Sequence, residues 1–216
     1  MQIGIIPVTA FQQNCSVLHC QETNKGAVVD PGGDLDQVLA YVRDEGVEIE
    51  KILLTHAHID HAGATKALRD ALKVPVIGPE REDEFLIEGI AMQGQMFGLG
   101  HAEPFVPDQW LVHGDRVSVG NEQFEVRHCP GHTPGHVVFH SRQDRLAFVG
   151  DVLFAGSIGR TDFPRGDHAT LINSITRNLW PLGNDVTFVP GHGPTSTFGQ
   201  ERATNPFVGD RVLQRG

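Results

Sequence analysis

Residues 55–61 read Thr-His-Ala-His-Ile-Asp-His, so four potential metal ligands fall within six positions. His56 and His58 are two positions apart, and their side chains share a face only if the backbone is extended or looped. Asp60 and His61 follow where a helical pattern begins. A single zinc ion held on a helix would instead use a His-Glu-x-x-His pattern. The stretch therefore predicts a looped site for two neighbouring metal ions.

Three more candidate ligands occur farther along the chain, each shortly after a predicted strand. They are His132, Asp151 and His192, and Gly or Pro stands close to each of them. Loops that leave strands commonly carry the functional sites of α/β proteins. For residues 56–61 alone, Asp60 could simply cap a helix while the histidines form a polar loop. The three later groups make that alternative remote.

Short apolar runs alternate with amphipathic segments, which predicts sheets whose outer faces are covered by helices. We expect helices at Leu35–Val42, Ala62–Leu72 and Leu171–Leu179, and a helix with a long surface loop in residues 80–108. We find no linker, and we expect one α/β domain over residues 1–216. The predicted strands are Ile3–Val8, Val17–Leu18, Ala27–Val29, Ile52–Leu54, Val74–Ile77, Phe124–Val126, Val137–Phe139, Leu146–Val149 and Val186–Val189.

The formal charge of -10 argues against a nucleic-acid partner held by a basic surface. Two divalent cations would nevertheless make one site locally cationic. Mean hydropathy is -0.19, and no apolar run is long enough to cross a membrane. Cys15, Cys20 and Cys129 lack zinc-knuckle spacing, and Cys129 is expected to be a buried strand residue. We expect a monomeric cytoplasmic protein without a membrane partner.

The order and spacing of the seven candidate ligands resemble the metallo-β-lactamase superfamily and, within it, the glyoxalase II (hydroxyacylglutathione hydrolase) group. The similarity extends from Asp30 to His192. It implies an αββα sandwich with two metals in a cleft at one edge. Asp30 would support a ligand from behind, although an Asp-Pro-Gly-Gly turn also explains it. The resemblance assigns His56, His58 and His132 to one metal, Asp60, His61 and His192 to the other, and Asp151 to both.

Seven side chains with one of them shared give each metal four protein groups, which leaves a position for bridging water. Imidazoles with few carboxylates suit zinc, iron or manganese, and we expect two divalent transition metals, zinc foremost. Metal coordination lowers the pKa of water from 15.7 to about 7, so hydroxide can be the nucleophile without a separate base. Asp60 and Asp151 are then the catalytic carboxylates. No dedicated general acid is evident, which favours thioesters over amides.

The resemblance implies hydrolysis of S-D-lactoylglutathione to D-lactate and glutathione, a step of methylglyoxal detoxification. Full-length glyoxalase II proteins also carry a C-terminal helical domain with basic glutathione contacts, whereas only positions 193–216 follow His192 here. We therefore expect a short form. Arg160, and secondly Arg165, are candidates for holding a glutathione carboxylate, or they are solvated loop arginines. Met92, Met96 and Phe97 could line an acyl pocket, but the pattern favours a packed helix face.

Residues 159–163 and 201–206 are also similar to persulfide dioxygenases of this superfamily, which hold one iron through positions matching His56, His132 and Asp151. A mononuclear iron dioxygenase is therefore the alternative function. The acidic charge disfavours a nuclease and the single Tyr41, in a predicted helix, disfavours a lactonase. Retention of all seven ligands disfavours a non-catalytic metal-binding protein. His136 looks like a structural part of the family signature.

Overall fold

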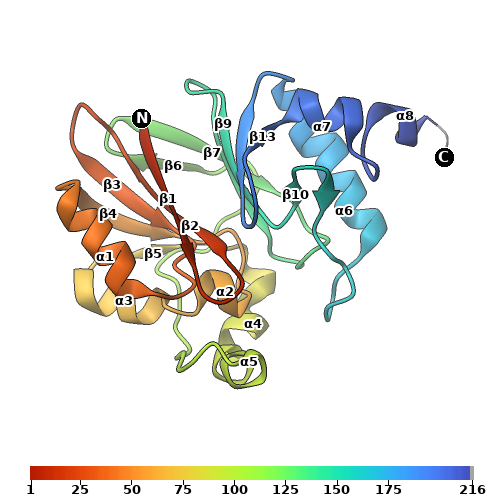
Figure 1. The fold of residues 1–216 in the computed structure, drawn as a ribbon. Helices are drawn as coiled ribbons and strands as arrows, with labels where there is room; N and C mark the ends of the chain where they lie inside the picture. Colours follow the sequence, from red (N-terminus) through yellow and green to blue (C-terminus); the bar gives the residue numbers. More distant parts are fainter. Residues whose placement is uncertain (215–216) are drawn as a thin grey trace.

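The computed structural model, which describes residues 1–214, has two sheets packed face to face. Helices α1 (Leu35–Asp44) and α3 (Thr65–Leu72) cover the outer face of the first sheet, and α6 (His168–Ser174) and α7 (Phe198–Thr204) lie outside the second (Figure 1). This four-layer arrangement confirms the predicted αββα sandwich. The strands of the first sheet, in their order across it, are Gln2–Val8 (β1), Gln13–His19 (β2), Lys25–Val29 (β3), Glu48–Leu53 (β4) and Val76–Ile77 (β5).

The second sheet has the order β13-β12-β9-β8-β7-β6. β9 pairs parallel with β12, while β8 is antiparallel to both β7 and β9, so β7, β9 and β12 all run in the same direction. Their carboxyl ends therefore meet at one edge. The elements are Arg116–Val119 (β6), Glu122–His128 (β7), Val137–Ser141 (β8), Leu146–Gly150 (β9), Thr187–Pro190 (β12) and Ser196–Thr197 (β13), with the separate hairpin Leu153–Phe154 (β10) and Ser157–Ile158 (β11).

The helices are short. Every helix within residues 1–214 falls below the length and apolarity that a bilayer-spanning segment needs. They are Leu35–Asp44 (α1), Ile59–Ala62 (α2), Thr65–Leu72 (α3), Glu84–Glu88 (α4), Ile90–Phe97 (α5), His168–Ser174 (α6), Phe198–Thr204 (α7) and Asp210–Leu213 (α8), together with the 3₁₀ turns Arg81–Asp83 (η1) and Trp180–Leu182 (η3) and the π-helical Ile175–Leu179 (η2).

Three apolar clusters hold the layers together. The middle one fills the space between the two sheets and includes Val29, Phe124 and Phe139. The other two lie between each sheet and its helices. All five residues of both β8 and β9 are buried, as expected of strands covered on both faces. The sandwich thus buries its strand interiors and leaves their connecting loops free to carry polar groups.

The predicted helix at residues 62–72 was wrong in its boundaries. The chain forms α2 and α3 with a break at Gly63 and Ala64, because the Ala64 N–H donates to the Pro31 carbonyl, 3.0 Å away. A Cβ on Gly63 would lie 2.8 Å from the Gly32 carbonyl oxygen, so this close approach needs glycine. The segment predicted as one helix at 171–179 is likewise divided, into α6 and the π-helical η2.

Other differences involve short or exposed elements. Residues 80–108 form η1, α4 and α5 before an irregular segment, rather than one helix and a loop. The packed face predicted for Met92, Met96 and Phe97 was wrong, because these side chains are 67%, 71% and 41% exposed. β6 was not predicted, since it contributes only two buried valines at an edge. Cys129 is buried as expected but lies one residue after β7.

Candidate metal centre

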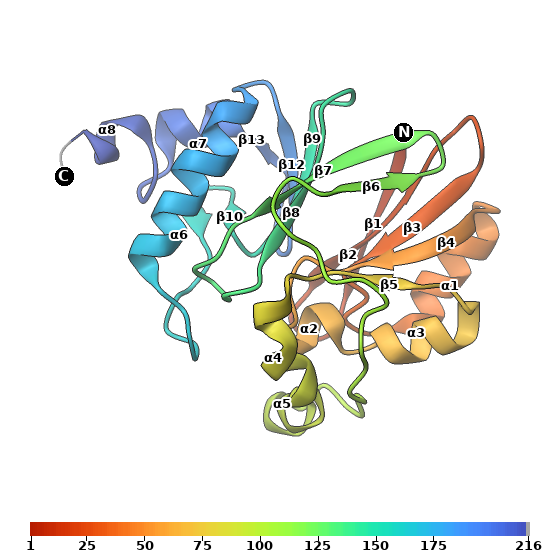
Figure 2. The same cartoon turned by 180° about the vertical axis from the view of Figure 1, so that it is seen from behind.

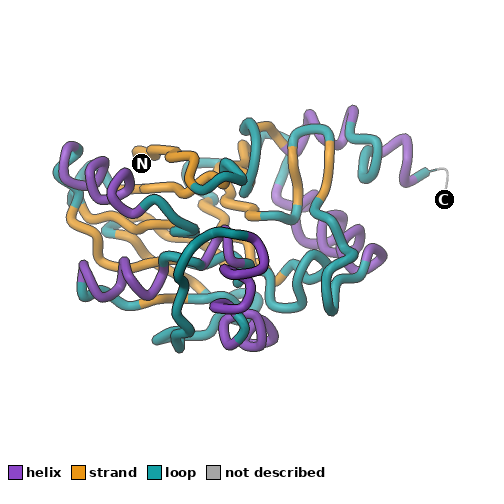
Figure 3. Tube along the Cα trace, turned by 60° about the horizontal axis from the view of Figure 1, so that its bottom comes forward, coloured by secondary structure: helices purple, strands orange, loops and turns teal. Residues whose placement is uncertain are grey.

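All seven predicted ligands lie on segments that follow β4, β7, β9 and β12. Loops and short helices gather at this edge, which Figure 3 turns toward the viewer, and Figure 2 shows it from behind. Gly191 brings the chain close enough to pack on the site. A Cβ there would collide with the Asp151 carboxylate and lie 2.5 Å from His61 Cε1. Glycine at this position therefore lets two ligand-bearing loops meet.

Three imidazoles form the first group, which we call the three-histidine group: His56, His58 and His132. Their candidate ligand atoms all lie within 4.8 Å of one another. His58 Nδ1 is 2.9 Å from His132 Nε2 and 3.2 Å from His56 Nε2. Burial, followed by the neighbouring His132, lowers the pKa of His58 to about 3, and burial also lowers the pKa of His56 and His132. The group therefore presents neutral nitrogens, the form that binds metal.

A second group, which we call the aspartate group, contains Asp60, His61 and His192, again with ligand atoms within 4.8 Å. His192 Nε2 lies 3.1 Å from an Asp60 oxygen. Burial opposes charge on the two histidines, but the carboxylates outweigh it. The pKa of His61 is raised by Asp151 and Asp60, and that of His192 by its hydrogen bond with Asp60. This group is also more open, since the His192 side chain is 28% exposed.

Asp151 lies between the two groups. One of its oxygens is 3.2 Å from His61 Nε2 and the other is 3.5 Å from His132 Nε2. Burial raises its pKa, but the surrounding histidines outweigh that effect and hold the pKa well below its usual range. His61 Nε2 and Asp151 Oδ1 are buried and face each other at 3.2 Å, and neither has a further hydrogen-bond partner within residues 1–214. Buried polar atoms left in this way are costly, and divalent cations between the two groups would satisfy them.

In four of the histidines, the ring nitrogen that points away from the centre already forms a hydrogen bond within the protein. His56 Nδ1 donates to the Thr55 hydroxyl at 3.1 Å, and His61 Nδ1 to Asp30 at 2.9 Å. His132 Nδ1 donates to the Arg160 carbonyl at 2.7 Å, and His192 Nδ1 to that of Phe11 at 3.1 Å. In these four histidines Nε2 is therefore the nitrogen that faces the centre, and in His61 and His192, whose pKa values are raised, it must lose a proton before it can bind a metal. Metal-binding histidines are oriented by such bonds.

Asp30 occupies the position expected of a supporting carboxylate. Besides His61, it accepts hydrogen bonds from the Thr55 N–H at 2.7 Å and the Thr55 hydroxyl at 2.6 Å. Asp30 has a left-handed backbone, with φ 52°, and is buried. With these bonds it joins the loop after β3 to the loop after β4. The turn and the hydrogen bond to His61 therefore coexist, and the role of Asp30 in supporting a metal ligand stays a prediction.

Two further buried residues stabilise the centre. His136 Nε2 accepts the Asp151 N–H at 3.0 Å, and its ring stacks on His56 with centroids 4.6 Å apart. The other residue, Asp83, was missed by sequence reasoning. It accepts hydrogen bonds from both the His56–His58 loop and the His132–His136 loop. Because Glu80, Glu82 and Glu84 surround it in the sequence, Asp83 looks like one more solvated acidic residue at the start of a helix.

The arginines predicted to bind substrate lie on the loop that passes the three-histidine group. Phe163 of that loop packs on His58, with ring centroids 4.9 Å apart. The Arg160 guanidinium pairs with both oxygens of Asp162 at 2.6 Å, and it is 60% exposed. Arg165 lies over the ring of Phe85, 4.1 Å from its centroid. Both guanidinium groups therefore already have protein partners.

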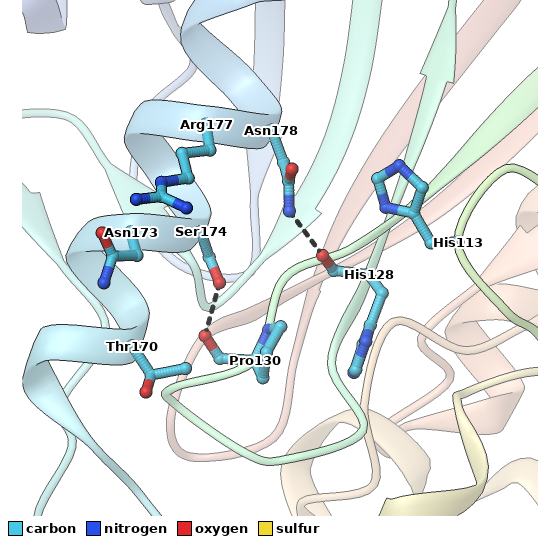
Figure 4. A pocket seen from close by; sticks show the side chains of 8 residues that line it. All are labelled: His113, His128, Pro130, Thr170, Asn173, Ser174, Arg177 and Asn178. Atoms are coloured by element: carbon cyan, nitrogen blue, oxygen red, sulfur yellow. Dashed lines mark hydrogen bonds between the residues drawn. The ribbon is translucent and has the colours of Figure 1, made fainter.

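A cavity of about 350 Å³ lies outside the metal centre, against α6 and η2 (Figure 4). Two hydrogen bonds join residues that line it. Ser174 donates to the Pro130 carbonyl at 2.7 Å, and Asn178 donates to that of His128 at 2.8 Å. They hold the chain between β7 and His132 from behind. None of the seven ligands lines this cavity, so the cavity and the metal centre are separate features.

The family model of the metallo-β-lactamase superfamily matches residues 8–192. Hydroxyacylglutathione hydrolase GloC of Haemophilus influenzae is 45% identical over 212 residues, covering 98% of this chain and all of that protein. Among solved structures, the BLEG-1 B3 metallo-β-lactamase is 34% identical with a TM-score of 0.89, over 96% of this chain and 99% of that one. TTHA1623 in a di-iron-bound form is 38% identical with a TM-score of 0.87, over 94% of this chain and 99% of that one.

Fold, site and sequence define a metallo-hydrolase that has two adjoining groups of ligand-type side chains. The chain belongs to the metallo-β-lactamase superfamily. Its near-complete overlap with a hydroxyacylglutathione hydrolase identifies it as a hydrolase of that superfamily. The histidine and aspartate groups, together with a di-iron-bound structural relative, support two metal ions.

Proposed function

We propose that this chain is a two-metal thioesterase whose principal substrate is S-D-lactoylglutathione. One observation carries the proposal: Asp151 lies within 3.5 Å of histidines from both ligand groups, so one carboxylate can serve two ions. The similarity to a hydroxyacylglutathione hydrolase over the whole of that relative supports the choice of substrate. The chemistry of the centre supports the reaction class.

The proposed ligands follow the two groups. Histidine-rich sets of this kind suit zinc, and iron is also compatible with them. When bound, two such ions would lower the pKa of water to about 7 and polarise a carbonyl oxygen. The first ion would take His56, His58 and His132, the second Asp60, His61 and His192, and both would share Asp151.

The protein's own contribution is charge and orientation. Asp60 and Asp151 both have lowered pKa values, because nearby histidines outweigh the effect of burial, so both are anionic at neutral pH. Two carboxylates against two dications leave a cationic site in an acidic protein. This favours an anionic substrate. A departing glutathione thiolate resembles a cysteine side chain with a pKa of about 8.5, so it needs little protonation.

The carboxylates of glutathione need a cationic partner, and we propose Arg160 for this role, with Arg165 second. Arg160 would exchange Asp162 for the substrate carboxylate. Its exposed position and its link through the backbone to His132 place it beside the proposed metal ligands. This contact would select the thiol half of the thioester without taking part in the bond-breaking step.

The test is metal analysis followed by two assays on one preparation. Metal-replete protein is expected to hold close to two transition-metal ions per chain and to hydrolyse S-D-lactoylglutathione without consuming oxygen. The alternative is a persulfide dioxygenase with one iron at His56, His132 and Asp151. One iron per chain, no second ion on adding zinc, and oxygen uptake with glutathione persulfide would establish that alternative.

A further inference from the structure

Asp83 is a buried carboxylate at the end of η1, and its side chain contacts neither ligand group directly. One oxygen accepts the Ala57 N–H at 3.1 Å and the Thr133 hydroxyl at 2.9 Å. The other accepts the Gly135 N–H at 2.7 Å. Ala57 lies between His56 and His58, and Thr133 follows His132. One carboxylate thus ties together the two loops that carry the three-histidine group.

The packing around Asp83 leaves little room for another arrangement. Gly135 is also held from the same segment, because its carbonyl accepts the Glu80 N–H at 3.0 Å. A Cβ on Gly135 would lie 2.5 Å from the Glu80 carbonyl oxygen and 2.8 Å from Asp83 Cγ. Such contacts are too close, so the loop after His132 reaches Asp83 only because position 135 is glycine.

Asp83 also forms no ion pair within residues 1–214, so its role there depends on these three hydrogen bonds. Burial raises its pKa to about 7, although the hydrogen bonds oppose that shift. A buried carboxylate without a cation is costly to keep in a fold. A carboxylate at position 83 is therefore not explained by fold stability alone. All of its hydrogen-bond donors come from the two loops that carry the three-histidine group.

We propose that Asp83 is a positioning residue that sets the metal affinity of the three-histidine group by fixing the distance between its two loops. The inference rests on the proposed two-metal function. Asp30 makes the corresponding connection for the aspartate group, because it holds His61 and Thr55. Asp83 thus lies behind the three-histidine group, while Asp30 contacts His61 of the aspartate group directly and reaches His56 only through the Thr55 hydroxyl.

Glu201 offers a matched control. It is also buried and accepts three hydrogen bonds, from Gly156 N–H at 2.8 Å, Ser196 Oγ at 2.6 Å and Asn205 Nδ2 at 2.9 Å. None of these donors stands next to a proposed ligand. Asp83→Ala and Glu201→Gln should both lower the Tm of the metal-free protein. Only Asp83→Ala should weaken metal binding, by about 10- to 100-fold.

The experiment measures cobalt(II) binding by absorption in two backgrounds. In His192→Ala, the tightly held ion is expected to occupy the three-histidine group. Adding Asp83→Ala should then lower the affinity of this group for cobalt by about 10- to 100-fold. In His58→Ala, the remaining ion occupies the aspartate group, and adding Asp83→Ala should leave its affinity unchanged. Equal weakening in both backgrounds, or weakening in neither, overturns the proposal.

If Asp83→Ala does not fold, Thr133→Val replaces it, because this change removes one of the three donors and keeps the shape of the side chain. The cobalt affinity should then fall by up to about tenfold, and again only in the His192→Ala background. A Thr133→Val protein that binds cobalt as tightly as its parent in that background overturns the proposal. Failure of the unmutated protein to bind two ions would instead count against the proposed function.

Discussion

The two ligand groups differ in charge and in exposure, although they lie side by side. The three-histidine group is neutral: burial lowers the pKa of each of its imidazoles. In the aspartate group, carboxylates raise the pKa of both histidines, and His192 is partly open to solvent. An ion entering the first group meets nitrogens that are ready to bind. An ion entering the second must displace protons and gains a carboxylate, so one fold offers two unlike metal environments.

The most severe test removes the residue that both environments share. We expect Asp151→Ala to lose at least one metal ion and nearly all activity. Without this carboxylate, two dications separated by roughly 3.5–4 Å would repel each other across an uncompensated site. Elemental analysis and thioester hydrolysis measure the two losses. Turnover near the wild-type rate with both ions retained would show that Asp151 is not the bridge and that the groups act separately.

A pH titration tests the difference in charge. A proton competes with a metal for an imidazole nitrogen below that nitrogen's pKa. For His61 and His192 this pKa lies above the ordinary 6.5, whereas for His58 it is about 3. Lowering the pH from 8 to 5.5 should therefore release the ion of the aspartate group first.

Expected losses are roughly tenfold in affinity per pH unit for each histidine that must lose a proton. Isothermal titration in buffers of different ionisation enthalpy should show more protons released by the second ion than by the first. The His58→Ala and His192→Ala proteins serve as single-group controls. Release of both ions at the same pH would contradict the distinction between the groups.

The segments that carry the candidate ligands could be predicted from the sequence, because each has a recognisable local pattern. Residues 56–61 combine ligand chemistry with a spacing that excludes a helix, and His132, Asp151 and His192 each follow a strongly apolar strand. The ends of paired strands meet at the edge of a sheet, so this pattern was sufficient to predict that the seven side chains lie close together. All seven side chains lie at one edge of the sandwich, and their assignment as metal ligands stays a prediction.

Residues that act through a single long-range contact left no such pattern. Asp83 is one acidic residue among several, and its contacts with residues 57, 133 and 135 appear only after folding. The exposure of Met92 and Met96 was also unpredictable, because helical spacing shows that a face is apolar but not what covers it. Short elements such as β6 have too few apolar residues to give a periodic signal.

The smallest expected effect concerns the outer side of the three-histidine group. The Arg160 backbone carbonyl holds His132, while its guanidinium lies in solvent paired with Asp162. Arg160→Ala leaves the carbonyl in place, so metal content should not change. If the guanidinium binds a glutathione carboxylate, the KM for S-D-lactoylglutathione should rise.

A charge-assisted contact can contribute about 1.5–3 kcal/mol, but Arg160 is exposed and must first leave Asp162, so we expect a rise of roughly threefold to tenfold. The value of kcat should remain close to wild type, because this contact is the same in the ground and transition states. Asp162→Ala provides the opposing control, since it frees the guanidinium and should leave KM equal or lower. Both variants are assayed on S-D-lactoylglutathione and on a small thioester without carboxylates. An equal loss on the two substrates would mean that Arg160 supports the His132 loop, and the three-histidine group would then depend on its outer loop for metal binding as well as for substrate.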